Sequence, residues 1–317
     1  MKPRALRRDA KSSDALSPCS ALCVSGAGNR FLLVDARGGG LPAGAREMAR
    51  RAREITAPVS GGFVPDGLLF VTSPACADAS LRMVILNADG TRPQACGNGL
   101  RCLTDWAVRA GLLQGGEGVV ETDGGLRAVR WSGTGEDLRV EVCLGGVAVV
   151  ATDALADLAK REALELPVDE PWPVHTLELA NPHIVVCVPG PDGAAWIRDL
   201  PNDRFAQIAR ALAQRTPHGA NVELIAPLPQ GGVSSHLFMR VFERGVGETE
   251  ACGTGSAAAA WVAQKWLGVK SPVAVHQRGG ILTVDRDASD ELWLSGPVIQ
   301  HGIASFSGAT WDTSSTS

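Results

Sequence analysis

The sequence predicts a mixed α/β protein built from two similar halves, and three observations support this fold class. Strand-like and helix-like segments alternate along the 317 residues. The motif Ala-Cys-Gly-x-Gly occurs twice, around Cys96 and around Cys252, each time ahead of a helix-like segment. An asparagine precedes each cysteine by a similar distance, 67 positions for Asn29 (96 − 29) and 71 for Asn181 (252 − 181). This agreement predicts an internal duplication whose pseudo-two-fold axis brings the two cysteines together.

The first half contains mostly short apolar runs with two helical patterns. Residues 45–55 have helical spacing, and so do residues 98–112, where Leu100 and Trp106 share one face and Gly111 ends the pattern. The strands of this half are predicted at residues 31–35, 68–72, 81–86, 118–121, 126–131 and 138–143.

The second half repeats this order. Its predicted elements are strands at 183–188, 222–225 and 236–242, and helices at 203–215 and 254–267. The boundary is expected near the Gly145-Gly146 pair. The predicted organisation is a disordered extension (1–18), a first half (19–146), a second half (147–306) and a flexible tail (307–317).

Composition excludes several classes of protein. The net charge of −4 gives no basic face for nucleic acid, and no apolar run approaches the length of a membrane span. The eight cysteines show neither a CxxC pair nor a Cys/His cluster with the spacing of a zinc site. Residues 1–18 lack the apolar core of a signal peptide. We therefore expect free thiols, no metal and a cytoplasmic location.

The paired motifs indicate a particular chemistry. A cysteine at a helix N-terminus lies beside unpaired backbone N–H groups, and the helix dipole is expected to lower the pKa of its thiol. The same N–H groups can bind a carboxylate. Two facing helix ends would therefore hold one carboxylate with a sulfur on each side of the neighbouring carbon. One thiolate could remove a proton from that carbon while the other thiol delivers one to the opposite face.

A pyridoxal cofactor would be another way to acidify this carbon, and it needs a Schiff-base lysine. None of the five lysines lies in a Gly- or Ser-rich context that would bind the cofactor phosphate: Lys2, Lys11, Lys160, Lys265 and Lys270. The sequence therefore favours a reaction without a cofactor, assisted by fixed N–H dipoles that stabilise the enediolate.

These motifs resemble those of the diaminopimelate epimerases. Residues 87–102 (Asn-Ala-Asp-Gly-Thr-Arg-Pro-Gln-Ala-Cys-Gly-Asn-Gly-Leu-Arg-Cys) resemble the first signature of that family, and residues 243–255 (Glu-Arg-Gly-Val-Gly-Glu-Thr-Glu-Ala-Cys-Gly-Thr-Gly) resemble the second. Gly28-Asn29, Asn181-Pro182-His183 and Ala220-Asn221 match shorter motifs in the same order.

The resemblance covers roughly residues 22 to 306 and implies a fold and an activity. The fold would be two pseudo-symmetric α/β domains, each a β-barrel-like sheet wrapped around a central helix. The activity would be cofactor-independent interconversion of LL- and meso-2,6-diaminopimelate, a small-molecule substrate, in lysine and peptidoglycan biosynthesis. Nucleic acid and membrane are not expected partners, and both a monomer and a homodimer stay open.

Carried over to the matching positions, the resemblance implies that Cys96 and Cys252 are the two catalytic bases. The residues that it implies for substrate binding are Asn29, Asn87, Gly97, Asn98, Asn181, Asn221, Glu243, Arg244, Gly253 and Thr254. The Arg244 guanidinium can clamp a distal carboxylate. Three positions differ from the residues usual in that family. Gly67 stands where a glutamine is expected, Arg30 where an acidic residue is expected, and Ala180 where a glycine is expected.

Three alternatives stay open. A related two-cysteine racemase or epimerase, acting on proline, hydroxyproline or another amino acid, would not need the distal clamp. A catalytically inactive amino-acid-binding relative would need neither thiol. A thiol-redox protein is disfavoured because Cys96 and Cys252 are 156 positions apart (252 − 96) without a resolving CxxC. Of the other thiols, Cys19 and Cys23 are expected at the surface, and Cys76, Cys102, Cys143 and Cys187 in the core.

Overall fold

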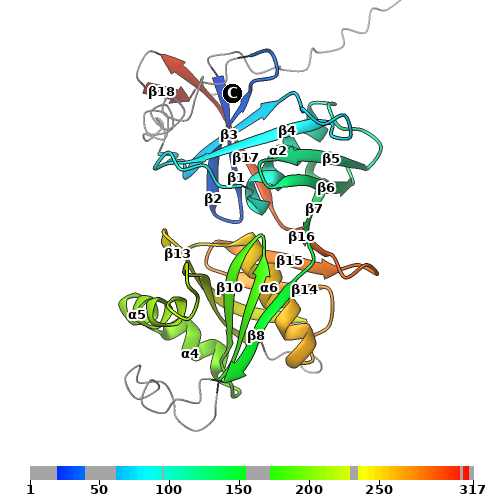
Figure 1. Cartoon of the computed structure of the whole chain (residues 1–317). Coiled ribbons are helices and arrows are strands. Elements are labelled where there is room, and N and C mark those ends of the chain that lie inside the picture. Colours follow the sequence, from blue (N-terminus) through cyan, green and yellow to red (C-terminus); the bar gives the residue numbers. More distant parts are fainter. Residues whose placement is uncertain are drawn as a thin grey trace, which may run out of the picture.

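A curved sheet wraps around one helix in each half of the molecule, and the two halves stack as two lobes (Figure 1). The computed structural model describes residues 20–39, 62–94, 96–154, 172–228, 235–307 and 310–313. The predicted helix at 45–55 and the predicted extension 1–18 lie outside these residues.

The first lobe surrounds helix α2 (Gly97–Arg109). Its strands are β1 (Ser20–Gly26), β2 (Asn29–Asp35), β3 (Gly67–Thr72), β4 (Leu81–Asn87), β5 (Glu117–Thr122), β6 (Gly125–Ser132), β7 (Arg139–Gly145), β17 (Val298–Ser307) and β18 (Thr310–Thr313). A 3-10 turn, η1 (Gly135–Asp137), joins β6 to β7.

The second lobe surrounds helix α6 (Gly253–Trp266), and helices α4 (Gly193–Asp199) and α5 (Asn202–Ala213) pack outside its sheet. Its strands are β8 (Ala148–Ala154), β9 (Pro173–Leu179), β10 (Asn181–Cys187), β11 (Asn221–Pro227), β12 (His236–Glu243), β13 (Gly247–Thr249), β14 (Val273–Gln277), β15 (Gly280–Arg286) and β16 (Leu292–Ser295). No helix in the described part of the chain is long and apolar enough to span a membrane.

Strand pairing shows the internal symmetry directly. In the first lobe the order is β17-β1-β2-β3-β4-β5-β6-β7, with β2–β3 and β4–β5 parallel and the other pairs antiparallel. In the second lobe the order is β8-β9-β10-β11-β12-β14-β15-β16, with β10–β11 and β12–β14 parallel. Pairs at the same place in the two strand orders are therefore parallel in both lobes or antiparallel in both lobes. The predicted mixed α/β fold and the duplication are confirmed.

The chain crosses between the lobes twice. Strand β8 follows β7 into the second lobe, and β17 returns from β16 to pair with β1 in the first (Figure 1). Strand β17 therefore lies within the predicted second half but pairs with the first. Part of the predicted tail is also a strand, because Thr310–Thr313 pair with β17. Between the lobes, β7 pairs with β16.

The middle of β2 and most of β3 are continuous apolar runs because both faces of these segments are buried. Leu33 of β2 and Leu69 of β3 face the core around α2. Leu32 of β2 and Leu68 of β3 face a second apolar cluster on the other side of the sheet. This alternation follows from the two-residue period of a strand. It explains why these segments are continuous apolar runs rather than alternating ones.

Both central helices are buried over most of their length. In α2, Leu100, Leu103 and Trp106 pack into the core, as the predicted face requires. In α6 the run Ala257–Ala260 is fully buried, so small side chains let the sheet close around the helix. The predicted helices extend to 112 and 267, whereas α2 ends at Arg109 and α6 at Trp266.

Two alanines adopt left-handed backbone conformations in equivalent turns. Ala27 (φ 49°) lies between β1 and β2, and Ala180 (φ 59°) between β9 and β10. A non-glycine residue pays for this conformation because its Cβ crowds the backbone, at a cost of about 1–2 kcal/mol. The resemblance places a glycine at position 180.

The Ala180→Gly variant should relieve this strain. We expect the free energy of unfolding to stay unchanged or rise by up to about 1 kcal/mol, because glycine's larger unfolded-state entropy offsets part of the gain. Urea denaturation would measure it. The matched control is Ala128→Gly, an exposed alanine of β6 with ordinary backbone angles, which should lose about 0.5–1 kcal/mol. Equal losses in both variants would contradict the strain.

Candidate active site

Cys96 and Cys252 are the N-cap residues of the two central helices. The Cys96 sulfur accepts a hydrogen bond from Gly99 N at 3.4 Å, and the Cys252 sulfur accepts one from Gly255 N at 3.4 Å. Both cysteines have extended backbone angles, as N-cap residues require. The loops before them also match, since Gly124 N donates to Gln94 O and Gly279 N donates to Glu250 O, each at 2.8 Å.

The two helix N-termini meet at the junction of the lobes. A Cβ placed on Gly253 would lie 2.8 Å from Leu294 Cδ2 and 3.5 Å from Asn98 Oδ1, and one on Gly97 would lie 3.0 Å from the same Leu294 carbon. Glycine at both positions is therefore what lets the helix ends approach this closely. Backbone N–H groups of both first turns can then face one anionic ligand.

The predicted lowering of the thiol pKa values is wrong for this structure. Burial raises the pKa of Cys96 above its ordinary value, and it raises the pKa of Cys252 further. The N–H groups of the helix ends do lower both values, as expected, but loss of solvent around the sulfur outweighs them. The prediction failed because the degree of burial was not visible in the sequence.

Glu243 lies within the electrostatic reach of both thiols. Its negative charge raises the pKa of Cys96 and the pKa of Cys252. Burial in turn raises the pKa of the Glu243 carboxyl, against hydrogen bonds from Thr249 and Cys252. The Glu243 carboxyl group, at the end of β12, therefore interacts electrostatically with both cysteines.

The surroundings of the two cysteines differ despite the shared backbone. His183 Nδ1 and Glu223 Oε1 are 2.7 Å apart and fully buried, and the same oxygen would lie 2.7 Å from a Cβ on Gly255. At the equivalent positions of β2 and β3 the first lobe has Phe31 and Leu69. The Glu223 charge adds to the rise in the Cys252 pKa.

Hydrogen bonds link three polar side chains of the first lobe, those of Arg101, Asn98 and Asn29. Arg101 donates to Asn98 Oδ1 at 2.7 Å, and Asn98 Nδ2 donates to Asn29 Oδ1 at 2.5 Å. A guanidinium has only donors, so the Asn98 atom that faces it must be the oxygen. This fixes both amides and leaves the Asn29 nitrogen as a donor.

Of the other predicted binding residues, Asn87, Asn221 and Arg244 lie at or next to strand ends, whereas Thr254 lies in the first turn of α6. Asn221 Oδ1 accepts from Arg244 N at 2.9 Å, and Thr254 Oγ1 lies 3.5 Å from the Cys252 sulfur. Asn87 donates to Thr91 at 2.9 Å. The exposed Arg244 side chain contacts the carbonyl oxygens of His218 and Gly219 at 3.4 Å each.

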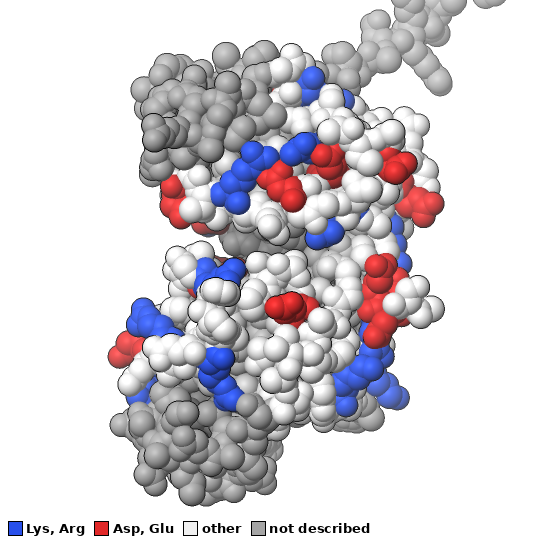
Figure 2. All heavy atoms as spheres, viewed as in Figure 1, with Lys and Arg blue, Asp and Glu red and all other residues white. Residues whose placement is uncertain are grey.

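The junction is packed more tightly on one side than on the other. The Ala27–Gly28 turn contacts the second lobe, since a Cβ on Gly28 would lie 3.0 Å from Gly279 Cα. Ala27 is accordingly buried, whereas Ala180 in the equivalent turn and its neighbour Asn181 are exposed. On the face shown in Figure 2 the lobes meet at a hollowed waist, with both signs of charge scattered around it.

Gly67, which stands where the family resemblance leads us to expect a glutamine, changes the shape of the first lobe. Gly67 pairs with Phe31 as Asn221 pairs with His183, so it occupies the position in the first lobe that Asn221 has in the second. A Cβ here would lie 2.4 Å from the Leu86 carbonyl oxygen. The first lobe therefore has no amide at this point and no room for one without a backbone shift.

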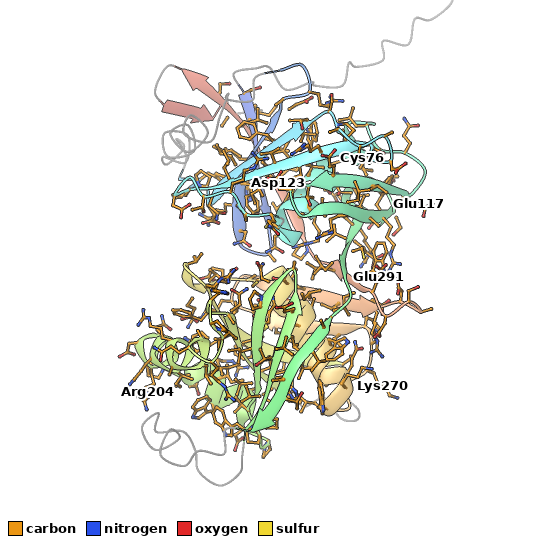
Figure 3. The ribbon with its side chains drawn as sticks, viewed as in Figure 1. Cys76, Glu117, Asp123, Arg204, Lys270 and Glu291 are labelled. Carbon is orange, nitrogen blue, oxygen red and sulfur yellow. The ribbon has the colours of Figure 1, made fainter. Side chains whose placement is uncertain are left out.

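The remaining cysteines lie outside the site. Cys102, Cys143 and Cys187 are buried as predicted, but Cys23 is also buried, in β1, and its predicted surface position is wrong. Cys19 is not among the described residues. Cys143 donates to Glu291, which Figure 3 shows close to the junction. Cys76 is only half-buried, in a turn of the first lobe between exposed neighbours, so its predicted core position is wrong.

Two residues of the site were not predicted from the sequence. Glu223 lies two positions after Asn221 on the same strand and therefore on the same face, a spacing that could have indicated it. Arg101 lies within the predicted helix 98–112, and no sequence signal shows that its side chain is fully buried.

Comparison with known proteins identifies the family of this chain. The sequence model of the family described as "Diaminopimelate epimerase" matches residues 22–150 and 176–299. A diaminopimelate epimerase of Moorella thermoacetica is 33% identical in an alignment 295 residues long, which covers 87% of this chain and 95% of the relative. A diaminopimelate epimerase of Desulforudis audaxviator is 33% identical in an alignment 289 residues long, which covers 86% of this chain and 94% of the relative.

Among solved structures, a phenazine biosynthesis protein of the PhzF family from Bacillus anthracis shares the fold. Its TM-score is 0.64 at 19% identity, and the match covers 90% of this chain and 98% of that one. The chain belongs to the diaminopimelate epimerase family.

Proposed function

We propose that this protein interconverts LL- and meso-2,6-diaminopimelate with Cys96 and Cys252 as its two bases. The observation that carries the proposal is the meeting of two cysteine-capped helix N-termini at the junction of two pseudo-symmetric lobes. Matching relatives are diaminopimelate epimerases, which supports the choice of substrate. The reaction is proposed to serve lysine and peptidoglycan biosynthesis in the cytoplasm.

The proposed reaction needs no group beyond the two sulfurs and the helix ends. One sulfur, as thiolate, takes the proton from Cα, and the electron pair moves into the adjacent carboxylate to form an enediolate. The other sulfur, as thiol, gives its proton to the opposite face of Cα. Backbone N–H groups at Gly97, Asn98, Gly253 and Thr254 stabilise the developing charge, each worth up to about 3 kcal/mol in a dry site.

The distal part of the substrate would be held by the polar residues at the strand ends. Glu243 can accept from an ammonium group, and the Arg244 guanidinium can bind the distal carboxylate with two parallel hydrogen bonds. Asn29, Asn87, Asn181 and Asn221 supply amide donors and acceptors around them. A monocarboxylic amino acid such as proline would leave Arg244 without its partner, so it should react poorly.

Label exchange tests both the substrate and the catalytic thiols. In deuterated water the reduced enzyme should introduce deuterium at Cα of LL- and meso-diaminopimelate, measured by mass spectrometry or proton NMR. Cys96→Ser and Cys252→Ser should each lower kcat/KM by about 10²-fold or more, because a hydroxyl is a far weaker base at neutral pH.

The control for these variants is Cys76→Ser, since Cys76 is half-buried and outside the site. It should retain wild-type exchange. Absence of label from a folded, reduced wild-type sample, or exchange with proline that exceeds exchange with diaminopimelate, would refute the proposed activity.

The pH dependence should reflect the raised thiol pKa values. A raised pKa keeps the thiol protonated to higher pH, while catalysis needs one thiolate. We expect the acid limb of the pH profile of kcat/KM to reach half its maximum above about pH 8.5, the ordinary pKa of a cysteine. A profile already flat at pH 7 would show that a thiolate persists in the free enzyme against the effect of burial.

A further inference from the structure

Arg101 carries a buried positive charge that the fold itself does not neutralise. Its side chain is fully buried in α2 and donates to two neutral oxygens, Asn98 Oδ1 at 2.7 Å and Pro297 O at 3.1 Å. Within the described residues, no carboxylate pairs with it, and its Nε has no partner. A guanidinium cannot lose its proton under ordinary conditions, so burying it unpaired is costly.

The nearest acidic side chains do not provide the missing charge. Asp105, one turn further along α2, is held by Arg109 at 2.9 Å and by Gln300 at 2.9 Å. Cys102 is next to Arg101, but burial raises the pKa of that thiol to about 12, so it stays neutral. Cys96 is the other thiol that interacts electrostatically with Arg101, and in the proposed reaction it becomes charged when it serves as the base.

The second lobe has no counterpart of this cation. Arg101 lies five positions after Cys96, and the fifth position after Cys252 is the buried Ala257. There the neutral Gln277 accepts from Cys252 N at 3.0 Å and donates to Ser256 at 2.8 Å. The carboxyl groups are also unevenly placed, because the charge of Glu223 acts on Cys252, whereas that of Glu243 acts on both cysteines. The site therefore has an unpaired cation acting on Cys96 and an additional carboxylate acting on Cys252.

We propose that Arg101 is a positioning residue of this site with two effects. Its charge stabilises the anion formed at Cys96, and its fixed donors orient Asn98 and, through it, Asn29. The inference rests on the proposed function for the identity of the substrate. The charge effect, however, concerns Cys96 alone and can be measured without any substrate.

Alkylation of the thiols by iodoacetamide tests the charge effect. The rate at Cys96 and at Cys252 would be followed separately by peptide mass spectrometry between pH 6.5 and 9.5. Removing a nearby cation disfavours the thiolate, so Arg101→Met should raise the pKa of Cys96. A rise of one pKa unit means about tenfold less thiolate, so Cys96 alkylation should slow by up to about tenfold. Besides Arg101, Glu243 also acts on Cys96, and it is left intact in this variant.

Two variants control this experiment. Arg109→Met makes the same change at the other end of α2, where the arginine is paired with Asp105, and it should leave Cys96 alkylation unchanged. Arg101→Lys keeps the charge and should keep the Cys96 rate close to wild type. Unchanged Cys96 alkylation in Arg101→Met, or equal slowing at Cys252, would overturn the charge effect.

The positioning effect has a separate readout in steady-state kinetics. Lysine cannot reproduce the planar fork of the guanidinium, so Arg101→Lys should raise KM for diaminopimelate about fivefold, the equivalent of one hydrogen bond. A lysine variant with wild-type KM would overturn this part.

Folding is not expected to obscure the result, because an apolar side chain at this position removes the cost of burying an unpaired charge. If Arg101→Met does not fold, Arg101→Gln replaces it with the same expectation for Cys96. Failure of the proposed function would appear as absent label exchange in the wild type. Failure of this inference would appear as unchanged Cys96 alkylation in an enzyme that still exchanges label.

Discussion

The contact between the N-termini of α2 and α6 is the feature on which the rest of the structure depends. Each helix is enclosed by its own sheet, so its N-terminus can emerge only where the lobes meet. Glycines at 97 and 253 let both ends approach Leu294, and each cysteine caps its own helix. The chain crosses between the lobes twice, after β7 and after β16, and these two strands pair with each other, so the junction is tied covalently at that point.

The backbone is nearly symmetric, but the chemistry at its centre is not. Equivalent strands have Phe31 and Leu69 in one lobe and the buried pair His183 and Glu223 in the other. A two-base reaction requires the two sulfurs to hold different protonation states at any moment, since one is base while the other is acid. Arg101 acts on Cys96 and Glu223 acts on Cys252, and this provides such a difference before any substrate binds, although Glu243 acts on both.

Much of this architecture could be predicted from the sequence because its signals are local. The Cys-Gly-x-Gly repeats located both helix starts, and continuous apolar runs located strands buried on two faces, such as β3. The pairing of β17 with β1 could not be predicted, because it joins residues more than 270 positions apart and depends on the closed fold. The direction of the thiol pKa shifts and the isolation of Arg101 depend on burial, which is a property of the packed structure rather than of the motif.

The central claim is that both sulfurs reach one carbon from opposite sides, and a crystal structure with diaminopimelate bound tests it most directly. The account predicts the Cys96 and Cys252 sulfurs on opposite faces of the same Cα, each at about 3.5 Å. It also predicts that the carboxylate on that carbon accepts from backbone N–H groups of both helices. A complex in which one sulfur contacts Cα while the other faces a different part of the molecule would contradict the account.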